Sequence, residues 1–218
     1  MAGDTTPDIN LSELAYQKLA KMILLRQLPG GTSVIEGRLA EELEISRTPM
    51  REALVRLAAE GLLVREGTRS FTVRKVTATE FFQCMKLREM LECEAIGLAV
   101  GRIEPARLAA LGAQIERLAT AAEQAADHWK ADDQLHLMFA DASGNEMLAK
   151  HIRQVRINTR LFEISSPIRR VKADGEEHLA ILAAFASGDA KVARRSMLRH
   201  LRNLQSEVMA ILRGWDVP

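Results

Sequence analysis

Apolar residues recur at spacings of three and four in the first third of the chain, in stretches separated by polar or glycine-rich breaks. This spacing is typical of α-helices that bury one face. It predicts helices over residues 11–28, 36–43 and 47–60. Ser12 and Ser46 are placed to cap the first and third of these helices, because a serine side chain can accept a hydrogen bond from the backbone of the first turn.

Two short runs with β-strand composition follow these helices. Residues 62–65 and 70–73 are rich in β-branched and other apolar side chains, and the residues between them include Gly67. Two such runs around a glycine-containing turn predict a β-hairpin. Three helices followed by a hairpin form the layout of a winged helix-turn-helix, whose third helix enters the major groove of DNA.

Beyond residue 76 the periodicity is helical almost to the end, with breaks at glycine and proline. It predicts six further helices, over residues 77–100, 104–126, 129–143, 145–165, 174–187 and 189–213. Helices of this length with short connections are typical of an antiparallel helical bundle. The predicted division of the chain is a flexible tail over 1–10, a winged helix-turn-helix over 11–75, a helical domain over 76–213 and a tail over 214–218.

Composition supports a mainly α-helical fold. Hydrophobic residues make up 47% of the 218 residues and aromatic residues only 4%, which is ample for a core but poor in the side chains that sandwiches and barrels prefer. The longest wholly apolar run, residues 179–186, is far shorter than the ~20 residues that cross a bilayer. The first residues lack the pattern of a signal peptide. We expect a cytoplasmic protein without membrane contact, with Cys84 and Cys93 as free thiols.

The formal net charge of the chain is +1, which by itself argues against a protein that binds nucleic acid. Residues 45–75, however, contain seven basic and three acidic residues. The third predicted helix begins there with Ser46, Arg47, Thr48 and Arg51. Arginine can bind guanine through two hydrogen bonds, and hydroxyl groups suit phosphate. An amphipathic helix with a solvated arginine face would show the same spacing, so both interpretations remain open on the pattern alone.

Four polar residues of the helical domain have the spacing of a metal site. Asp132 and His136 are four residues apart on one predicted helix and share a face, while His178 and His200 lie on two helices that a turn brings together. One carboxylate and three imidazoles can bind a divalent cation. Asp133 could replace Asp132, although the four-residue spacing favours Asp132. Histidines with a purely structural role would give the same pattern.

The first domain contains a long motif, LAEEL followed by SRTPMREAL and then EGL. With its flanks it resembles the winged helix-turn-helix of the GntR family of bacterial transcription regulators. The resemblance implies DNA contacts by Arg38, Ser46, Arg47, Thr48 and Arg51. Arg69, near the tip of the predicted hairpin, is a further candidate. The family often has basic residues followed by glycine at this tip, whereas the glycine of this chain comes earlier, which puts the contact by the hairpin in doubt.

The second domain contains LREMLECEAIGLAV, D..LH....DASGNEML and EEHLAILAAFASGDAKVARRSMLRHL. These segments resemble the FCD ligand-sensing domain of the FadR subfamily, over residues 76–212. The resemblance implies that a divalent metal ion is bound by Asp132, His136, His178 and His200. We expect zinc, with nickel or manganese as alternatives. Leu135 stands where phenylalanine is usual in the family, which changes the packing but removes no metal ligand.

A small effector would bind beside this metal. Arg88 matches a family arginine near the pocket and could pair with a carboxylate, unless it forms an exposed ion pair with Glu92 four residues on. Arg156 and Asn158 are further candidates from their helix positions. Effector contacts are therefore predicted at Arg88, Arg156 and Asn158.

The two resemblances together imply a homodimeric repressor of transcription. It would bind a pseudo-palindromic operator in double-stranded DNA and respond to a small carboxylate metabolite, while the helical domain would bind ligand and metal and form the dimer. Two other functions fit parts of the sequence: a hydrolytic metalloenzyme with Glu176 or Glu177 as its base, and a metal-free interaction bundle. A DNA-binding domain would be superfluous on an enzyme, so we expect no catalytic activity.

Overall fold

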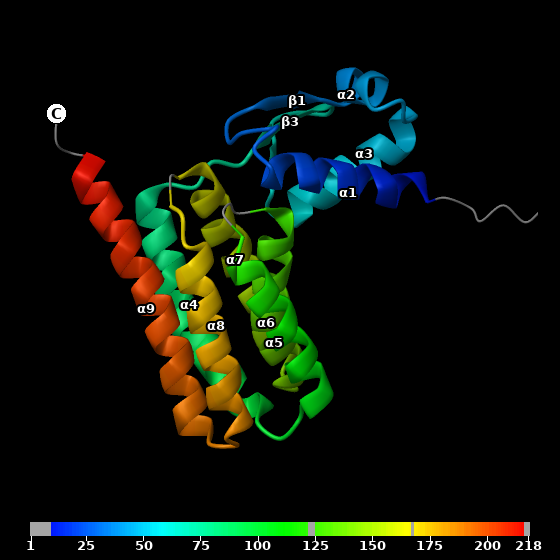
Figure 1. Cartoon of the computed structure of the whole chain (residues 1–218). Coiled ribbons are helices and arrows are strands. Elements are labelled where there is room, and N and C mark those ends of the chain that lie inside the picture. The colour runs from blue at the N-terminus through cyan, green and yellow to red at the C-terminus, as the bar shows by residue number, and fades with distance from the viewer. Residues whose placement is uncertain (1–9, 122–124, 167, 216–218) are drawn as a thin grey trace, which may run out of the picture. The chain divides into compact units, whose positions relative to one another are not determined.

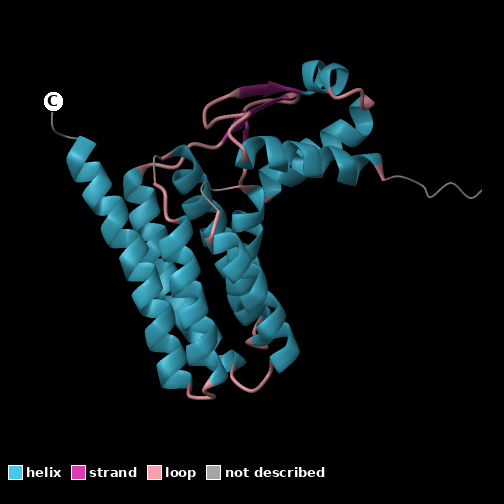
Figure 2. Cartoon of the chain, viewed as in Figure 1, coloured by secondary structure: helices cyan, strands magenta, loops and turns pink. Residues whose placement is uncertain are grey.

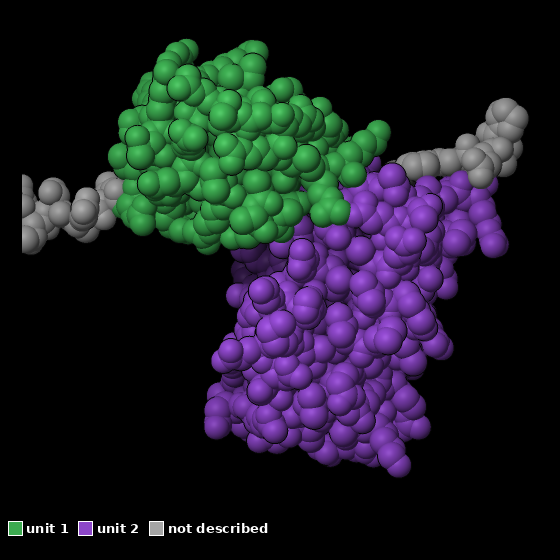
Figure 3. All heavy atoms as spheres, turned by 180° about the vertical axis from the view of Figure 1, so that it is seen from behind, with its two compact units in different colours: residues 1–75 green, residues 76–218 purple. Residues whose placement is uncertain are grey.

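The computed structural model describes residues 10–121, 125–166 and 168–215. Helices dominate it, and short strands lie in its first part (Figures 1 and 2). The chain divides into two compact units, Met1–Lys75 and Val76–Pro218 (Figure 3). The first unit combines helices with a small sheet, and the second is helical.

The first unit is a three-helix domain with an antiparallel sheet. Its helices are α1 (Leu11–Leu24), α2 (Glu36–Glu42) and α3 (Arg47–Ala59), and its strands are β1 (Ser33–Ile35), β2 (Leu63–Arg65) and β3 (Ser70–Val73). β3 lies between β1 and β2 and pairs antiparallel with both, so the predicted hairpin forms. The sequence pattern did not predict β1, because three residues are too few to show alternation. Its strand conformation comes from pairing, with Val34 opposite Phe71.

The apolar stripes of α1 and α3 pack against each other and form the core of the first unit. Leu19 and Ile23 of α1 and Leu54 of α3 are buried, as is Phe71 of β3. α3 ends at Ala59, one residue before the predicted end, and Gly61 beyond it adopts a left-handed φ of 85° that favours glycine. This packing fixes the direction of α3, whose exposed face is left for another partner.

The N-terminal caps of α1 and α3 differ in whether a side chain makes a capping hydrogen bond. The predicted cap of α1, Ser12, is wrong: the side chain of Asn10 accepts hydrogen bonds from the backbone N–H groups of Ser12 and Glu13, at 3.1 Å each. Asparagine is as good a cap as serine, and Ser12 already lies inside the helix. Ser46 does occupy the N-cap position of α3, but its hydroxyl makes no capping hydrogen bond.

The second unit is an all-α bundle of α4 (Ala78–Ala99), α5 (Pro105–Ala119), α6 (Ala126–Ala142), α7 (Glu146–Ser165), α8 (Val171–Ala186) and α9 (Ala190–Trp215). α4 packs against α6, α7 and α9, and α8 packs against α5 and α9. Gly144 and Gly188, with φ values of 74° and 75°, end α6 and α8 at two of the predicted breaks. The mainly α fold, with a winged helix-turn-helix followed by a helical bundle, is thus confirmed.

Several helix ends differ from the predicted ones. α1 ends at Leu24 and α5 at Ala119, earlier than expected, while α6 and α8 each begin three residues early. α6 begins early because His128 caps it: Nδ1 accepts from the backbone of Ala125 at 2.9 Å, and Nε2 lies 3.0 Å from the carbonyl of Leu118. Residues 214 and 215, expected in a tail, belong to α9. The remaining predicted tails, 1–9 and 216–218, fall outside the described residues.

Close packing within the bundle depends on one glycine. A Cβ atom at Gly175 of α8 would lie 2.6 Å from the Cβ of Ala119 on α5, so these two helices approach more closely than any other residue would allow. Cys84 and Cys93 are free, as predicted. Among the described helices, none combines the length and apolarity needed to cross a membrane.

Candidate functional site

The exposed start of α3 carries the residues expected to contact DNA. Ser46, Arg47, Thr48 and Arg51 are all exposed, while Met50 on the opposite side of the helix is completely buried. Because the Ser46 hydroxyl is not used in capping, it can donate to or accept from an external group. An N-terminal helix turn with free hydroxyls and two guanidinium groups suits phosphate and base edges together.

The other predicted DNA contacts surround this helix start. Arg38 of α2 is exposed, and a Cβ atom at Gly37 beside it would lie only 3.9 Å from Nη2 of Arg47, so α2 and the start of α3 lie against each other. Arg69 is exposed in the turn between β2 and β3. Within that turn, Nε of Arg65 donates to the carbonyl of Gly67 at 2.8 Å. All six predicted DNA contacts therefore lie on the exposed surface of the first unit.

One basic residue of this region has a structural role. The guanidinium of Arg56 lies 3.7 Å from the centre of the Tyr16 ring and pairs with Glu13 at 2.6 Å and with Glu60 at 3.1 Å. These contacts join α3 to α1. Arg56 is consequently neutralised within the domain and should add little to phosphate binding.

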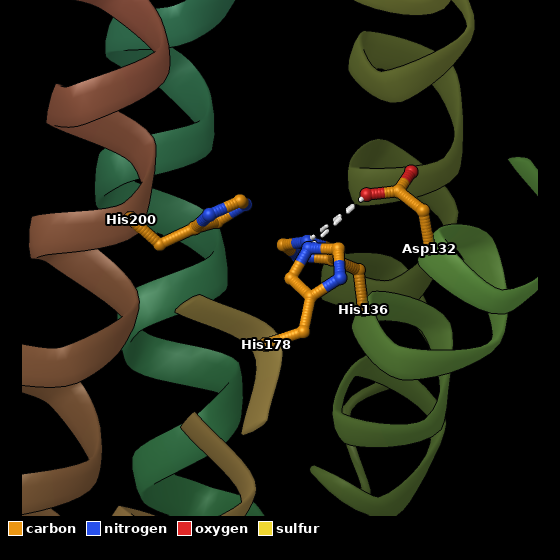
Figure 4. Close-up of side chains that lie close together, drawn as sticks. All are labelled: Asp132, His136, His178 and His200. Carbon is orange, nitrogen blue, oxygen red and sulfur yellow. Dashed lines mark ion pairs between the residues drawn. The ribbon is translucent and has the colours of Figure 1, made fainter. Parts of the chain in front are cut away.

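The four residues predicted to bind metal come together inside the bundle (Figure 4). α6 positions Asp132 and His136, α8 positions His178 and α9 positions His200, and the four side chains point toward one another. One potential ligand atom from each lies within 4.8 Å of the others. Nε2 of His136 and of His178 are 3.6 and 3.4 Å from the same oxygen, Oδ1 of Asp132.

This donor set fits a divalent cation. Ligand atoms of one tetrahedral zinc ion lie roughly 3.3 Å apart, given bond lengths of about 2.0–2.1 Å. The separations of the Asp132 oxygen from Nε2 of His136 and of His178 are close to this value. Both nitrogens are buried and have no hydrogen-bond partner in the described part of the chain. Buried polar atoms are normally satisfied, so these nitrogens are suited to a cation.

Two carboxylates contact the Nδ1 atoms of His136 and His200, on the side of each ring opposite Nε2. Nδ1 of His136 is hydrogen-bonded to Glu92 of α4, and Nδ1 of His200 lies 2.8 Å from Oε2 of Glu177 on α8. When Nδ1 donates to a carboxylate, Nε2 is unprotonated and can bind a metal. The carboxylates of Glu92 and Glu177 thus orient two rings of the cluster. Neither was predicted, because each approaches its histidine from a different helix and shares no periodic spacing with it.

Two arginines of α7 hold the carboxylates of α6. Nη2 of Arg156 donates to Oδ2 of Asp132 and to Oδ1 of Asp133, at 2.7 Å each. Nη2 of Arg160 donates to the same two oxygens. Oδ1 of Asp132 is left facing the imidazoles, whereas Asp133 is turned to the arginines and lies outside the cluster. The geometry favours Asp132 over Asp133 as the metal ligand.

Burial and neighbouring charges set the protonation of the cluster. Burial lowers the pKa of His136 to about 4 and lowers that of His178 well below its usual value. Burial acts in the opposite direction on Glu92 and Asp132, but the surrounding arginines outweigh it and hold both carboxyl pKa values well below the usual range. His136 and His178 are therefore neutral beside the ionised carboxylate of Asp132, which is the state that binds a metal.

Without metal, the part of the bundle's stability that depends on a neutral His136 is expected to be lost as the pH falls from about 6.5 toward 4. Burial raises the pKa of the Glu163 carboxyl to about 7, and this group adds stability over much of the same window as the pH falls, so the His136 contribution is measured by comparing variants. In this window an unfolded histidine takes up a proton that folded His136, with its pKa lowered to about 4, does not. The contribution, about 3 kcal/mol, is fully present above pH 6.5 and is lost as the pH falls. Between pH 7 and 5 the urea midpoint of the unaltered protein, followed by tryptophan fluorescence in a chelating buffer, should fall relative to that of His136→Gln. His151→Gln, at an exposed position, should follow the unaltered protein at every pH. A difference between the unaltered protein and His136→Gln that stays constant from pH 7 to 5 would contradict the prediction.

The predicted effector contacts occupy different places. The ion-pair alternative assumed that Arg88 is exposed, but its side chain is buried. Its Nε pairs with Oε1 of Glu92 at 2.6 Å, and its Nη1 donates to Thr159 at 3.3 Å. Arg156 touches Asp132 directly. Asn158 donates to Sγ of Cys84 on α4 at 3.5 Å, so its effector role stays a prediction.

Arg160 is the main residue at this site that the sequence did not reveal. It follows Arg156 by four residues and therefore shares its helix face, a signal that could have found it. Its guanidinium lies 4.1 Å from the centre of the Trp129 ring on α6. Arg160 thus joins α7 to α6 beside the candidate metal site.

Comparisons with known proteins agree with both halves of the structure. Residues 11–73 match the family model described as bacterial regulatory proteins, gntR family, and residues 83–203 match the FCD domain. The chain is 31% identical to the Nta operon transcriptional regulator of Aminobacter aminovorans, over 84% of this chain and 88% of that protein. It is 23% identical to the transcriptional repressor RspR of Escherichia coli, over 94% and 92% of the two chains. The solved structure of E. coli McbR/YncC aligns with a TM-score of 0.75 and 25% identity, over 95% of this chain and 100% of that one.

The FCD match alone covers more than half of the chain, and the Nta regulator is similar over most of both proteins. Members of this family are transcription regulators and not enzymes, so the metalloenzyme interpretation no longer applies. The chain therefore belongs to the GntR family of bacterial transcription regulators, with a DNA-binding winged helix-turn-helix followed by an FCD effector domain.

Proposed function

We propose that this regulator is a homodimeric repressor whose DNA binding is controlled by a small carboxylate effector, sensed beside a divalent metal ion. The observation that carries the effector part is the buried cluster of Asp132, His136, His178 and His200, with two imidazole nitrogens that lack hydrogen-bond partners among the described residues. Such a cluster is costly in a core unless a cation satisfies it.

In the DNA-binding unit, Arg47 and Arg51 would contact base edges, while Ser46 and Thr48 would contact phosphate. Arg38 and Arg69 would extend the contact on either side. A symmetric dimer would place two such surfaces on the two halves of a pseudo-palindromic operator. Leu87 and Met90, which are 45% and 62% exposed on one face of α4, support an apolar dimer contact through the bundle.

In the bundle, the four ligand residues would hold zinc, or else nickel or manganese. The bound ion would supply positive charge and open coordination positions for a carboxylate oxygen. Arg88 and Arg156 would pair with the effector's anionic group, and Asn158 would line its pocket. An effector of this kind changes the affinity for DNA only if it binds one arrangement of the dimer more tightly than another.

Selection of binding sites from random DNA, followed by mass measurement of the complex, tests this function. We expect a pseudo-palindromic consensus bound by two chains. Adding zinc together with a carboxylate that binds the FCD domain should weaken the binding of the two chains to this DNA. A consensus without symmetry or a single bound chain would contradict the dimer, and an effector that tightens the complex would contradict repression released by ligand.

The salt dependence of operator binding is expected to be shallow. Each phosphate that a protein neutralises adds about 0.9 to the slope of log K against log salt concentration. The exposed cationic contacts of each chain are few, since Arg56 is neutralised by Glu13 and Glu60. We expect a slope shallower than about −6 for the dimer, measured by fluorescence anisotropy from 50 to 200 mM salt. A slope near −10 would show that further basic residues contact phosphate.

A further inference from the structure

Arg156 and Arg160 hold more hydrogen-bonding capacity than the bundle uses. Their side chains are only 4% and 7% exposed. Each spends one nitrogen, Nη2, on the carboxylates of Asp132 and Asp133. Nε and Nη1 of both arginines are buried without a hydrogen-bond partner in the part of the chain that is described. Four buried cationic donors on adjacent turns of α7 are therefore available.

These donors adjoin the metal ligands directly. Both arginines bind Oδ2 of Asp132, and the other oxygen of this carboxylate faces His136 and His178. Nη1 of Arg156 lies 3.9 Å from Oε1 of Glu92, which is too long for a hydrogen bond. Buried guanidinium groups favour carboxylate or phosphate oxygens, which they can bind with two parallel hydrogen bonds. An anionic group could thus bind beside the metal without binding to it.

Asp133 already provides a carboxylate to this pair of arginines. Its Oδ1 lies 2.7 Å from Nη2 of Arg156 and 3.1 Å from Nη2 of Arg160. Its side chain is nonetheless 47% exposed, so its carboxylate can be hydrated when it leaves, while the buried arginines keep a partner only if a ligand carboxylate takes its place. Asp133 therefore resembles an internal stand-in that a ligand carboxylate can replace.

The space around the cluster limits the size of what can enter. A cavity of about 30 Å³ borders Asp132 and His178 and is lined on one side by Trp129. The ring of Trp129 also lies 4.1 Å from the guanidinium of Arg160. Neither Arg156 nor Arg160 nor Asp133 lines this cavity, so a ligand that reaches the arginine pair must also occupy the space that Asp133 leaves. Gly175 and Ala119, which lie in close contact, form part of the cavity wall. On the side of the metal ligands a compact group therefore fits better than a bulky one, whereas Asp133 also lines a larger hollow of about 440 Å³.

We propose that the effector is a compact dicarboxylate: one carboxylate lies at the metal ligands, and the second binds Arg156 and Arg160 in place of Asp133. This inference rests on the proposed function, because it assumes an effector beside the metal. It assigns to Arg160 the role of favouring effectors with two anionic groups over effectors with one. Asp133 acts as the competitor that the second carboxylate displaces.

Calorimetry with zinc-loaded protein tests this, with succinate and butyrate as probes, since both have four carbons and differ in one carboxylate. Succinate should bind at least about tenfold more tightly, as expected for added charge-assisted hydrogen bonds. Arg160→Gln should bring the ratio close to one. Asp133→Asn should act in the opposite direction and tighten succinate, while butyrate binding stays unchanged. Arg153→Gln, at an exposed arginine of the same helix, is the matched control and should leave the ratio unaltered.

Equal affinities for the two probes in the unaltered protein would overturn the proposal. So would a ratio that neither Arg160→Gln nor Asp133→Asn changes, or inorganic phosphate that binds as tightly as succinate. The Asp133→Asn arm remains decisive if Arg160→Gln does not fold. Zinc content, measured on every variant, separates this inference from the proposed function: absence of zinc uptake contradicts both, whereas zinc uptake with equal binding of both probes contradicts only the dicarboxylate.

Discussion

Replacing Arg47 and Arg51 together by alanine is expected to abolish operator binding while leaving the fold intact. Both side chains are exposed at the start of α3, and the buried face of this helix is formed by other residues, among them Met50 and Leu54. The substitutions therefore remove groups that point outward and leave the apolar core unchanged, although Arg51→Ala also removes the guanidinium that lies 3.9 Å from the buried carboxylate of Glu36. Each lost base contact costs about 1–3 kcal/mol and a dimer loses four of them, so operator binding should weaken by at least about 1,000-fold.

Gel-shift titration on the selected operator measures this effect, and circular dichroism checks the fold. A double variant of two exposed arginines of α5, Arg107→Ala with Arg117→Ala, is the matched control, since it removes the same charge from the other unit. If the control and the α3 variant weaken binding equally, the effect is one of net charge and α3 does not read bases. Unchanged affinity of the α3 variant for the operator would contradict the assignment of α3 as the recognition helix.

The double variant His178→Ala, His200→Ala is expected to lose its bound metal and the stability that metal provides. Two of the four potential ligands disappear, from α8 and α9, and the remaining pair lies on α6 alone. A ligand at 1,000 times its Kd stabilises a folded protein by about 4 kcal/mol. For a chain of this size that corresponds to a rise in Tm of roughly 8–16 °C. Zinc should raise the Tm of the unaltered protein by such an amount and that of the variant not at all.

Elemental analysis of the purified protein should give about one divalent ion per chain, and none for the variant. His151→Ala, at an exposed position of α7, should retain both the metal and the thermal response. Metal-free protein whose Tm does not change with zinc, nickel or manganese would contradict the site. The histidines would then be structural, as one of the alternatives from the sequence assumes.

The long helices of the bundle were predictable because each repeats its apolar spacing over many turns, and glycine breaks such as Gly144 and Gly188 mark their ends. The short strand β1 was not predictable, since its conformation depends on β3, far along the chain. The starts of α6 and α8 were predicted three residues too late. The early start of α6 depends on the side chain of His128, whose capping hydrogen bond is not visible as a periodic pattern.

The candidate site shows the same division between local and distant information. Asp132 and His136 share one helix face, so their proximity follows from a spacing of four. Bringing His178 and His200 to them required the resemblance to a known family, in addition to the turn between α8 and α9. Glu92 contacts His136 from a helix 44 residues earlier in the chain, and no spacing rule connects the two. The network behind the ligands therefore had to come from the three-dimensional structure.

The close contact between Gly175 and Ala119 would bear on which ion the candidate site prefers. Gly175 lies one helical turn before His178, so the distance between α5 and α8 also sets how far His178 reaches toward Asp132. A larger side chain at this position would push α5 and α8 apart and so shift His178 relative to the ligands on α6 and α9. A shift that lengthens these separations would enlarge the candidate coordination cage. Larger cages favour ions with longer bonds and more ligands over compact tetrahedral ones. Position 175 is therefore a place where evolution or engineering could change ion selectivity without touching a single ligand.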